Sequence, residues 1–400
     1  IEKDGVIYYF IDNEYYFKRE MLYGSFDDAE RFAYFNMAVL SMFPCIGFFP
    51  DILHAHDWQS ALSVIYAKTI FSHDPRYARM RTVFTIHNIE YQGQYDFSIL
   101  GDVFALGPLE RPVVEYGDCI NLMKGAIVCS DIVSTVSPRY AEEIRTPQYS
   151  HGLDPILNQN AYKLRGILNG IDYVYYDPAK DPCIAKKYSA KTLKNKVQNK
   201  LALQHNLALP EREDVPLIAV VSRLAAHKGI DLISEIAYKL VSEGDVQLII
   251  LGKGDPAYEG FFRELENNFR DKVRAMIMYN RDLSKMIYAA ADIFLMPSRS
   301  EPCGLSQMIA SRYGAIPVTR ETGGLYDSIK GYWLDGDKVM GNGFTFANYN
   351  SGELLDRIYA ALTLYHEKDK REALVKKIMN TDFSWSASAK KYLEMYDELC

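Results

Sequence analysis

Charged side chains occur directly after two runs of β-branched residues that the sequence predicts as strands. Arg223 and Lys228 follow the run Leu217–Val221, and Glu301 follows the run Ile293–Met296. Two cations at a strand–helix junction, where backbone N–H groups also point outward, suit a diphosphate. The alternative for the two cations is a solvated loop. Together the runs predict anion binders and a carboxylate at successive strand ends of one sheet.

A glycine-rich turn follows a third run of the same part of the chain. Gly252, Gly254 and Asp255 come after Val246–Leu251 and match the G-x-G-x-x-G/A pattern of dinucleotide sites. That pattern needs an acidic residue after the next strand to bind the ribose, and Tyr279 stands there instead. We therefore expect these glycines to permit close backbone approach rather than to bind NAD.

A second glycine pair, Gly323 and Gly324, comes after Thr322, just beyond the run Ile316–Val318. Glycines lack a side chain, so their N–H groups can approach an anion closely. The pair is predicted to offer backbone donors to a phosphate.

In the first part of the chain, histidine, aspartate and asparagine stand at predicted strand ends. His54, His56 and Asp57 end one run, His87 ends the next, and Asn169 follows a third. These side chains can form hydrogen bonds with the hydroxyl groups of a sugar. The alternatives are a metal pair at His54 and His56, which share one face of a strand, and a capping or packing role for His87. No third ligand cluster appears near the histidine pair.

Alternation of short apolar runs with amphipathic stretches predicts the fold class. In the first part the strands are expected at Val6–Ile11, Asp51–Ala55, Thr82–Ile86, Ile132–Val136 and Lys163–Leu168, with helices at Asp27–Ser41, Gln59–Phe71, Leu122–Ser130 and Pro138–Arg145. In the second part the strands are expected at Leu217–Val221, Val246–Leu251, Val273–Met278, Ile293–Met296 and Ile316–Val318. The helices there are expected at Ile230–Glu243, Tyr258–Asn268, Asp282–Ala290 and Gly304–Tyr313. This order is typical of an α/β protein with two Rossmann-like, doubly wound domains facing a cleft.

The domain boundaries follow from composition. We expect a first domain over 1–172, a second over 173–383, and a C-terminal helix over 384–400 that packs back on the first domain. The polar stretch from Asp177 to Lys200 is interpreted as a linker that leads into a helix. The C-terminal helix is expected to present its apolar face through Trp385, Ala389, Leu393 and Tyr396.

Bulk properties exclude several classes of protein. The net charge of −7 disfavours non-specific binding to nucleic acid or anionic membranes, and the sequence has no apolar run of membrane-spanning length. The six cysteines show neither C-x-x-C pairs nor metal-site spacing, which favours reduced thiols and a cytoplasmic location. Oligomeric state stays open.

Taken together, the motifs resemble bacterial glycogen synthases and plant starch synthases of the glycosyltransferase B (GT-B) fold. The matching segments, in order, are His56–Trp58, Thr85–Asn88 with Tyr91–Gly93, Leu168–Asp172, Ser222–Leu224 with Lys228–Gly229, Gly252–Asp255, Glu301–Leu305 and Thr322–Leu325. The related broad group of sugar-nucleotide transferases carries a second glutamate eight residues after the first. Ile309 occupies that position here, which favours the synthase branch.

The resemblance implies a role for each site residue. Arg223 and Lys228 would neutralise the departing diphosphate, and Glu301 would lie beside the donor glucose. His87 would contact the donor sugar, and Asp57 and Asn169 would lie near the sugar and the acceptor. The implied substrate-binding residues are Asn169, Gly252, Gly254, Asp255, Tyr279, Cys303, Gly304, Leu305, Thr322, Gly323 and Gly324. Among them, Tyr279 would stack on the base, and Cys303 would make the site sensitive to thiol reagents.

The resemblance also implies the reaction: transfer of glucose from ADP-glucose, or another nucleotide-glucose, to an α-1,4-glucan with retention of configuration. No cofactor or metal is expected. The Lys-[Ser/Thr]-Gly-Gly loop of the family is not found in the first domain, and the chain starts at Ile1. We therefore expect the first domain to be incomplete at its N-terminus. A catalytically incomplete nucleotide- or glucan-binding remnant is the alternative, with a Rossmann oxidoreductase and a phosphorylase of the same fold as more distant ones.

Overall fold

The computed structural model describes all residues from Ile1 to Cys400. The chain forms two compact units, which are described separately. The first contains residues 1–136, 141–167 and 393–400, and the second contains residues 137–140 and 168–392. None of the helices combines the length and the apolar character that a membrane span requires.

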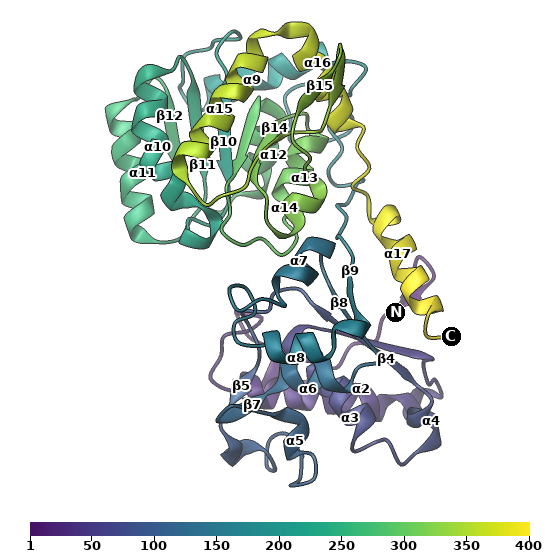
Figure 1. Cartoon of the computed structure of the whole chain (residues 1–400). Helices are drawn as coiled ribbons and strands as arrows, with labels where there is room; N and C mark the ends of the chain where they lie inside the picture. Colours follow the sequence, from purple (N-terminus) through teal and green to yellow (C-terminus); the bar gives the residue numbers. More distant parts are fainter. The chain divides into compact units, whose positions relative to one another are not determined.

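The first unit is built on a four-stranded parallel sheet with the order β3-β4-β8-β9 (Figure 1). The strands are β3 Ile52–His56, β4 Arg81–Ile86, β8 Ile132–Thr135 and β9 Leu164–Gly166. The predicted strands are confirmed here to within a few residues. Because β3 and β4 are neighbours and parallel, His56 pairs with Thr85 and the two strand ends meet.

Helices cover this sheet. Helix α3 (Asp57–Lys68) packs between α2 (Asp28–Ile46) and α6 (Leu122–Cys129) and contacts β3 and β4. Asn36 joins two of the helices, since its Oδ1 accepts from Ser63 N and Ser63 Oγ. Helix α2 runs past its expected end at Ser41 and stops where Gly47 adopts a left-handed conformation.

Smaller elements complete the unit. They are α1 Glu14–Phe17, α4 Pro75–Ala78, α5 Arg111–Val114, α7 Pro138–Glu143 (whose first residues fall in the second unit), α8 Asp154–Gln159, the 3-10 turns Phe97–Ile99 and Ala161–Lys163, and an antiparallel sheet of β5 Gln94–Tyr95, β7 Cys119–Asn121 and β6 Glu115–Tyr116.

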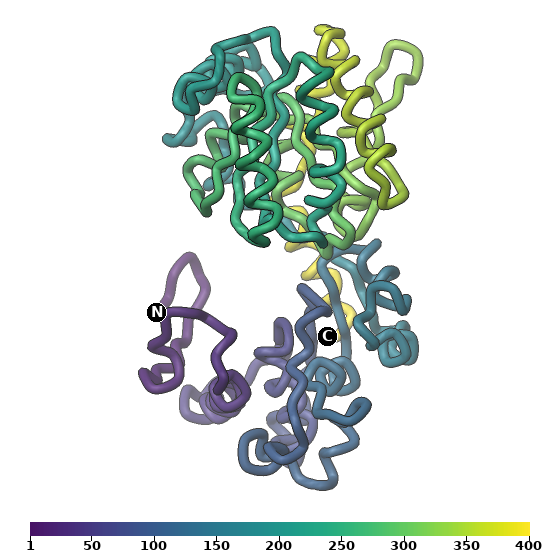
Figure 2. Tube along the Cα trace, turned by 90° about the vertical axis from the view of Figure 1, so that its left-hand side faces the viewer, coloured from purple at the N-terminus to yellow at the C-terminus, as the bar shows by residue number.

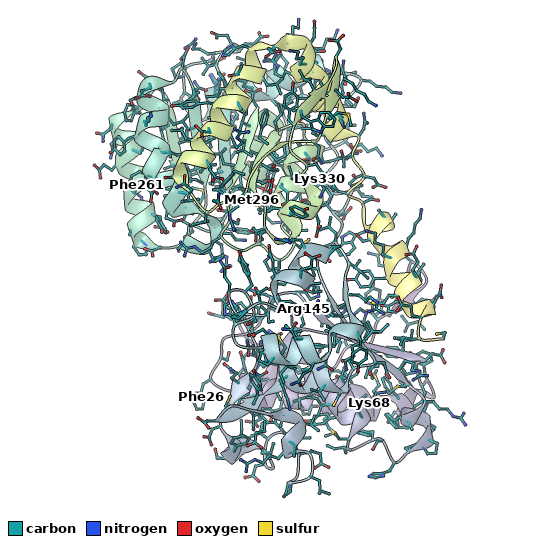
Figure 3. All side chains as sticks on the ribbon, in the orientation of Figure 1. Phe26, Lys68, Arg145, Phe261, Met296 and Lys330 are labelled. Atoms are coloured by element: carbon teal, nitrogen blue, oxygen red, sulfur yellow. The ribbon has the colours of Figure 1, made fainter.

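The predicted strand Val6–Ile11 is wrong. Instead, β1 (Glu2–Lys3) and β2 (Val6–Ile7) form a short antiparallel hairpin whose residues are exposed. Asp4 and Gly5 both have positive φ, and Asp-Gly is the sequence that favours such a tight hairpin turn. The dark purple N-terminal segment extends away from the parallel sheet in Figure 2, and Phe26 is fully exposed (Figure 3).

The second unit contains a six-stranded parallel sheet with the order β12-β11-β10-β13-β14-β17. The strands are β10 Leu217–Val221, β11 Gln247–Leu251, β12 Val273–Met276, β13 Ile293–Met296, β14 Ile316–Arg320 and β17 Phe344–Phe346. In chain order this is 3-2-1-4-5-6, the doubly wound arrangement, and the direction of winding reverses between β10 and β13. Ligands bind at such a reversal, beyond the carboxyl ends of the strands.

Helices flank both faces of this sheet (Figures 1 and 2). Their bounds are α9 Lys196–Asn206, α10 Ile230–Glu243, α11 Pro256–Asn268, α12 Arg281–Ala290, α13 Ser306–Arg312, α14 Gly323–Ser328, α15 Ser351–His366 and α16 Lys368–Met379, with 3-10 turns at Leu193–Asn195 and Ala226–Lys228. Met296 ends β13 within the core (Figure 3). Strand β17, helices α15 and α16 and the hairpin of β15 (Trp333–Asp335) and β16 (Lys338–Met340) were not predicted.

The stretch from Asp177 to Lys200 is a packed part of the second unit, so the predicted linker is wrong, whereas the helix into which it was predicted to lead is confirmed as α9. Tyr188 is buried and donates to Tyr313 O at 2.6 Å. Asp181 is buried beside the Tyr313 hydroxyl and 3.5 Å from Lys285 Nζ. The polar composition suggested solvent exposure, but these polar groups are buried because each has a partner.

Helix α17 (Trp385–Asp397) contacts its surroundings through only part of the expected face. Trp385 and Leu393 are 47% and 61% exposed, whereas Ser388 and Met395 are buried. Near the C-terminus, Tyr396 OH lies 2.6 Å from His54 Nδ1. The apolar spacing located the helix, but its buried face was chosen by this contact and its neighbours.

Glycines let the loops at the carboxyl edge of the second sheet approach one another. A Cβ on Gly252 would lie 2.0 Å from Ser222 O, and one on Gly254 would lie 2.2 Å from Leu224 O. On the other side, a Cβ on Gly324 would lie 1.9 Å from Cys303 O. Close backbone approach, expected for Gly252 and Gly254, is therefore confirmed.

We expect His54 to make the first unit less stable in mild acid. Burial, reinforced by the imidazoles of His56 and His87, lowers the pKa of His54 from 6.5 to about 3. Below pH 6.5 the unfolded chain binds a proton that folded His54 does not. The free energy of unfolding should fall by up to about 1.4 kcal/mol per pH unit from this group. Urea unfolding between about pH 5 and pH 6.5 should show a shallower pH slope for His54→Gln than for wild type.

The exposed His73 supplies the control. His73→Gln should keep the wild-type slope. Equal slopes for all three proteins would contradict the assignment to His54.

Gly324→Ala should destabilise the second unit, because the added methyl group overlaps the Cys303 carbonyl. A loss of about 1–3 kcal/mol is expected from such overpacking. Gly260 lies within α11 with nothing near its Cβ position, so Gly260→Ala should instead stabilise by about 0.5–1 kcal/mol. Thermal and urea unfolding measure both, and a neutral Gly324→Ala would show that the loop is not held as described.

Candidate functional site

An ion pair lies at the point where the winding of the second sheet reverses. Lys228 Nζ donates to Glu301 Oε2 at 2.7 Å, although 73 residues separate them. Glu301 is 5% exposed and the Lys228 side chain 18%. Gly229, with φ of 73°, makes the approach possible, since a Cβ there would lie 2.2 Å from Pro297 O. The predicted neighbourhood of the cation and the carboxylate is thus present in the structure.

Arg223 lies on the same loop but is exposed. Its Nη2 atom donates to His227 Nε2 at 3.2 Å. The guanidinium therefore keeps most of its donors available at the surface, as a residue that meets an anion from solution requires.

The cavity beside the predicted residues has a volume of ≈ 480 Å³. It is larger than a second cavity, of about 290 Å³, between α9 and Met286. Four predicted residues line it: Arg223, Gly252, Tyr279 and Leu305. Tyr279 is 84% exposed, so its ring stands free at the cavity wall. The volume and the mixture of aromatic rings with cations suit a nucleoside and its phosphates.

Sequence reasoning missed part of this wall. Tyr175 and Tyr176 line the cavity, and Lys285 Nζ lies 3.6 Å from the centroid of the Tyr175 ring. Lys253 and Arg281 also line it. The signal available in the sequence was the pair of adjacent tyrosines shortly after the Asn-Gly-Ile-Asp motif.

The glycine pair of α14 supports the Glu301 loop. Gly324 N donates to Glu301 O at 3.0 Å, so this N–H group already has a partner. The carbonyl of the neighbouring loop thus occupies the Gly324 N–H group in this structure, and the role of Gly324 as a phosphate donor stays a prediction. Gly323 packs on the same carbonyl, since its Cβ would lie 2.0 Å from Glu301 O. Thr322, just before them, is buried.

The remaining predicted residues of the second unit surround these loops. Asp255 caps α11 by accepting from Ala257 N, and Gly254 N donates to Glu259 Oε1 at 3.0 Å. Gly304 has φ of 69°, and Leu305 is 46% exposed. Asp255 therefore has a structural role, and the turn at Gly304 aims Leu305 into the cavity wall.

Cys303 is buried, and it accepts a hydrogen bond from the backbone of Asn169. Burial raises the pKa of the Cys303 thiol to about 12. The expected sensitivity to thiol reagents is therefore not supported, because the reactive thiolate is disfavoured. Asn169 Oδ1 is buried without a hydrogen-bond partner, which leaves an acceptor available to a ligand.

In the first unit, Asp57 and His87 are brought together at the ends of β3 and β4. Asp57, with φ of 58°, accepts from His87 N at 2.7 Å and from Asn88 N at 3.4 Å. Burial raises the pKa of Asp57, while His87 and these backbone donors oppose the rise. The carboxylate holds the His87 turn, a role that the sequence did not reveal.

The His87 ring belongs to a row of three imidazoles. His87 Nε2 lies 3.0 Å from His56 Nδ1, and the His56 ring stacks on His54 with centroids 4.2 Å apart. His54 Nε2 in turn lies 2.6 Å from Thr85 Oγ1. No group of three or more His, Cys, Asp or Glu side chains is arranged to hold a metal ion.

Comparison with protein families divides the chain in two. Residues 1–159 match the starch synthase catalytic domain, and residues 205–380 match the glycosyl transferases group 1. The glycogen synthase of Anoxybacillus flavithermus is 46% identical over 401 aligned residues, which cover 100% of this chain and 82% of that protein. The glycogen synthase of Geobacillus stearothermophilus is 47% identical with the same coverage.

Among solved structures, the catalytic domain of starch synthase IV from Arabidopsis thaliana, bound to ADP and acarbose, matches with a TM-score of 0.87 and 39% identity. The match covers 96% of this chain and 80% of that one. Sucrose-phosphate synthase from Thermosynechococcus elongatus shares the fold, with a TM-score of 0.59 and 17% identity over 93% of this chain and 78% of that one. The predicted GT-B fold is confirmed. The chain belongs to the glycogen and starch synthase family and is a glycosyltransferase.

Proposed function

We propose that the chain transfers glucose from ADP-glucose to the non-reducing end of an α-1,4-glucan, with retention of configuration. The observation that carries this proposal is the Lys228–Glu301 pair, in a chain 46% identical to a glycogen synthase. The two loops that hold this pair also contribute Arg223 and Leu305 to the ≈ 480 Å³ cavity. ADP as the nucleotide is supported by the starch synthase IV structure, which contains ADP. Six free cysteines support a cytoplasmic location.

We propose that the second unit promotes the reaction mainly through its charged side chains. As the bond between C1 of glucose and the diphosphate oxygen breaks, negative charge grows on the leaving diphosphate. Arg223 and Lys228 stabilise that charge, and the proton of the acceptor hydroxyl passes to the leaving group. Such fixed charges act without reorganisation at the moment of reaction. Glu301 balances Lys228 and accepts hydrogen bonds from the glucose hydroxyls.

The other residues are proposed to shape the substrate sites. Tyr279 stacks on the base, and Gly252 and Gly254 keep the adjacent loop close to the phosphates. His87, held by Asp57, contacts the sugar, and Asn169 offers its unpartnered oxygen. Cys303, Gly304, Leu305, Thr322, Gly323 and Gly324 fix the loops around the donor. No cofactor or metal is proposed.

Two alternatives lose support. The comparisons do not favour a non-catalytic remnant, since similarity to glycogen synthases extends over the whole of this chain and 82% of those relatives. A dinucleotide oxidoreductase was suggested by Gly252 and Gly254, but these glycines are required by contact with Ser222 and Leu224.

Transfer of radiolabelled glucose to glycogen tests the proposal. Label from ADP-glucose should enter the polymer faster than label from UDP-glucose. Glu301→Gln should nearly abolish transfer while the melting temperature stays close to wild type. A Glu301→Gln variant with full activity would remove Glu301 from the centre, and an absence of labelled polymer with the wild-type chain would refute the function.

Arg223→Ala and Lys228→Ala should both lower activity, but they should differ in their melting temperatures. Each removes charge stabilisation of about 2–4 kcal/mol from the transition state, measured as a fall in kcat/KM for the donor. Lys228→Ala should in addition lower the melting temperature, because it leaves the buried Glu301 carboxylate without its cation. Arg223 is exposed, so Arg223→Ala should melt like wild type; a shared loss of stability would contradict these environments.

A further inference from the structure

Both hydrogen bonds to the Glu301 side chain end on the same oxygen. Glu301 Oε2 accepts from Lys228 Nζ at 2.7 Å and from Ser298 Oγ at 3.0 Å. Ser298 is completely buried. A serine hydroxyl that donates to a carboxylate fixes the orientation of that carboxylate. Oε1 is left for another donor.

The backbone around this carboxylate is fixed from three directions. Arg299 N donates to His227 O at 2.9 Å, Gly324 N donates to Glu301 O at 3.0 Å, and Arg320 Nη1 donates to Arg299 O at 2.8 Å. The main chain of the loop is therefore set by neighbouring loops. What stays adjustable is the side chain of Glu301, whose torsion angles are restrained by Ser298 and Lys228.

The two restraints differ in kind. Lys228 has a long side chain with 18% of its surface exposed, and its charge is attracted to any diphosphate that binds beside it. Ser298 has a short side chain, no exposure and no charge. When a diphosphate competes for the ammonium group, the serine hydroxyl keeps its bond to Oε2.

We propose that Ser298 is a positioning residue that holds Glu301 Oε2 so that Oε1 faces the glucose hydroxyls throughout the reaction. This inference rests on the function proposed above and adds a residue that acts through Glu301 without touching the substrate.

The test compares Ser298→Ala, Ser298→Thr and Ser300→Ala in the full chain with ADP-glucose and glycogen. Ser298→Ala should lower kcat by about 10–100-fold, the loss expected for one hydrogen bond to a charged group, with a KM for ADP-glucose near that of wild type.

Two variants separate positioning from general damage. Ser298→Thr retains the hydroxyl and should restore most of kcat. Ser300 is in the same loop and only partly buried, so Ser300→Ala should behave like wild type. Calorimetric binding of ADP and the melting temperature show whether Ser298→Ala is folded. Should it unfold, Ser298→Thr must then be folded and retain most of the wild-type kcat.

Distinct results overturn distinct statements. An active wild type with an unchanged kcat in Ser298→Ala overturns the role of Ser298 and leaves the function standing. The same holds if kcat falls and Ser298→Thr, although folded, is no better than the alanine variant. A wild-type chain that transfers no glucose from either nucleotide overturns the function, and the role of Ser298 with it.

Discussion

The ion pair between Lys228 and Glu301 is the interaction on which the site depends. It brings a buried carboxylate to the sheet edge where a ligand binds, and a buried charge requires a partner. The two residues come from loops after β10 and β13, which are neighbours in the sheet because its winding reverses there. The fold therefore creates the contact, and the contact in turn makes the carboxylate tolerable inside the protein.

Glycines are the second condition for this site. Gly229 packs on Pro297, Gly252 and Gly254 pack on the loop after β10, and Gly324 packs on Cys303. At each position a side chain would collide with a backbone carbonyl. The glycine motifs that suggest phosphate binding in the sequence thus act mainly by letting loops touch each other, which holds the charged residues in place.

In the first unit, the residues at the strand ends are held by hydrogen bonds and ring packing rather than by an ion pair. Asp57 accepts from the backbone of the His87 turn, and three imidazoles are packed in a row behind it. Burial, reinforced by neighbouring imidazoles, lowers the pKa of His54 and of His56, which keeps these two side chains uncharged at neutral pH. An uncharged histidine can both donate and accept a hydrogen bond, which is the property that a residue needs to bind sugar hydroxyls.

The sequence by itself determined the parallel sheets and the positions of Glu301, Lys228, Asp57 and His87 at strand ends, because alternation of apolar strands with helices is a local pattern. It missed β17 and placed a strand at Val6–Ile11, where the local Asp4-Gly5 turn prevailed. Only the tertiary structure decided which groups contact the site residues. The Ser298 hydroxyl on Glu301, the carbonyl that occupies the Gly324 amide and the face of α17 that is buried all depend on segments distant in sequence, and residue spacing within one segment carries no information about them.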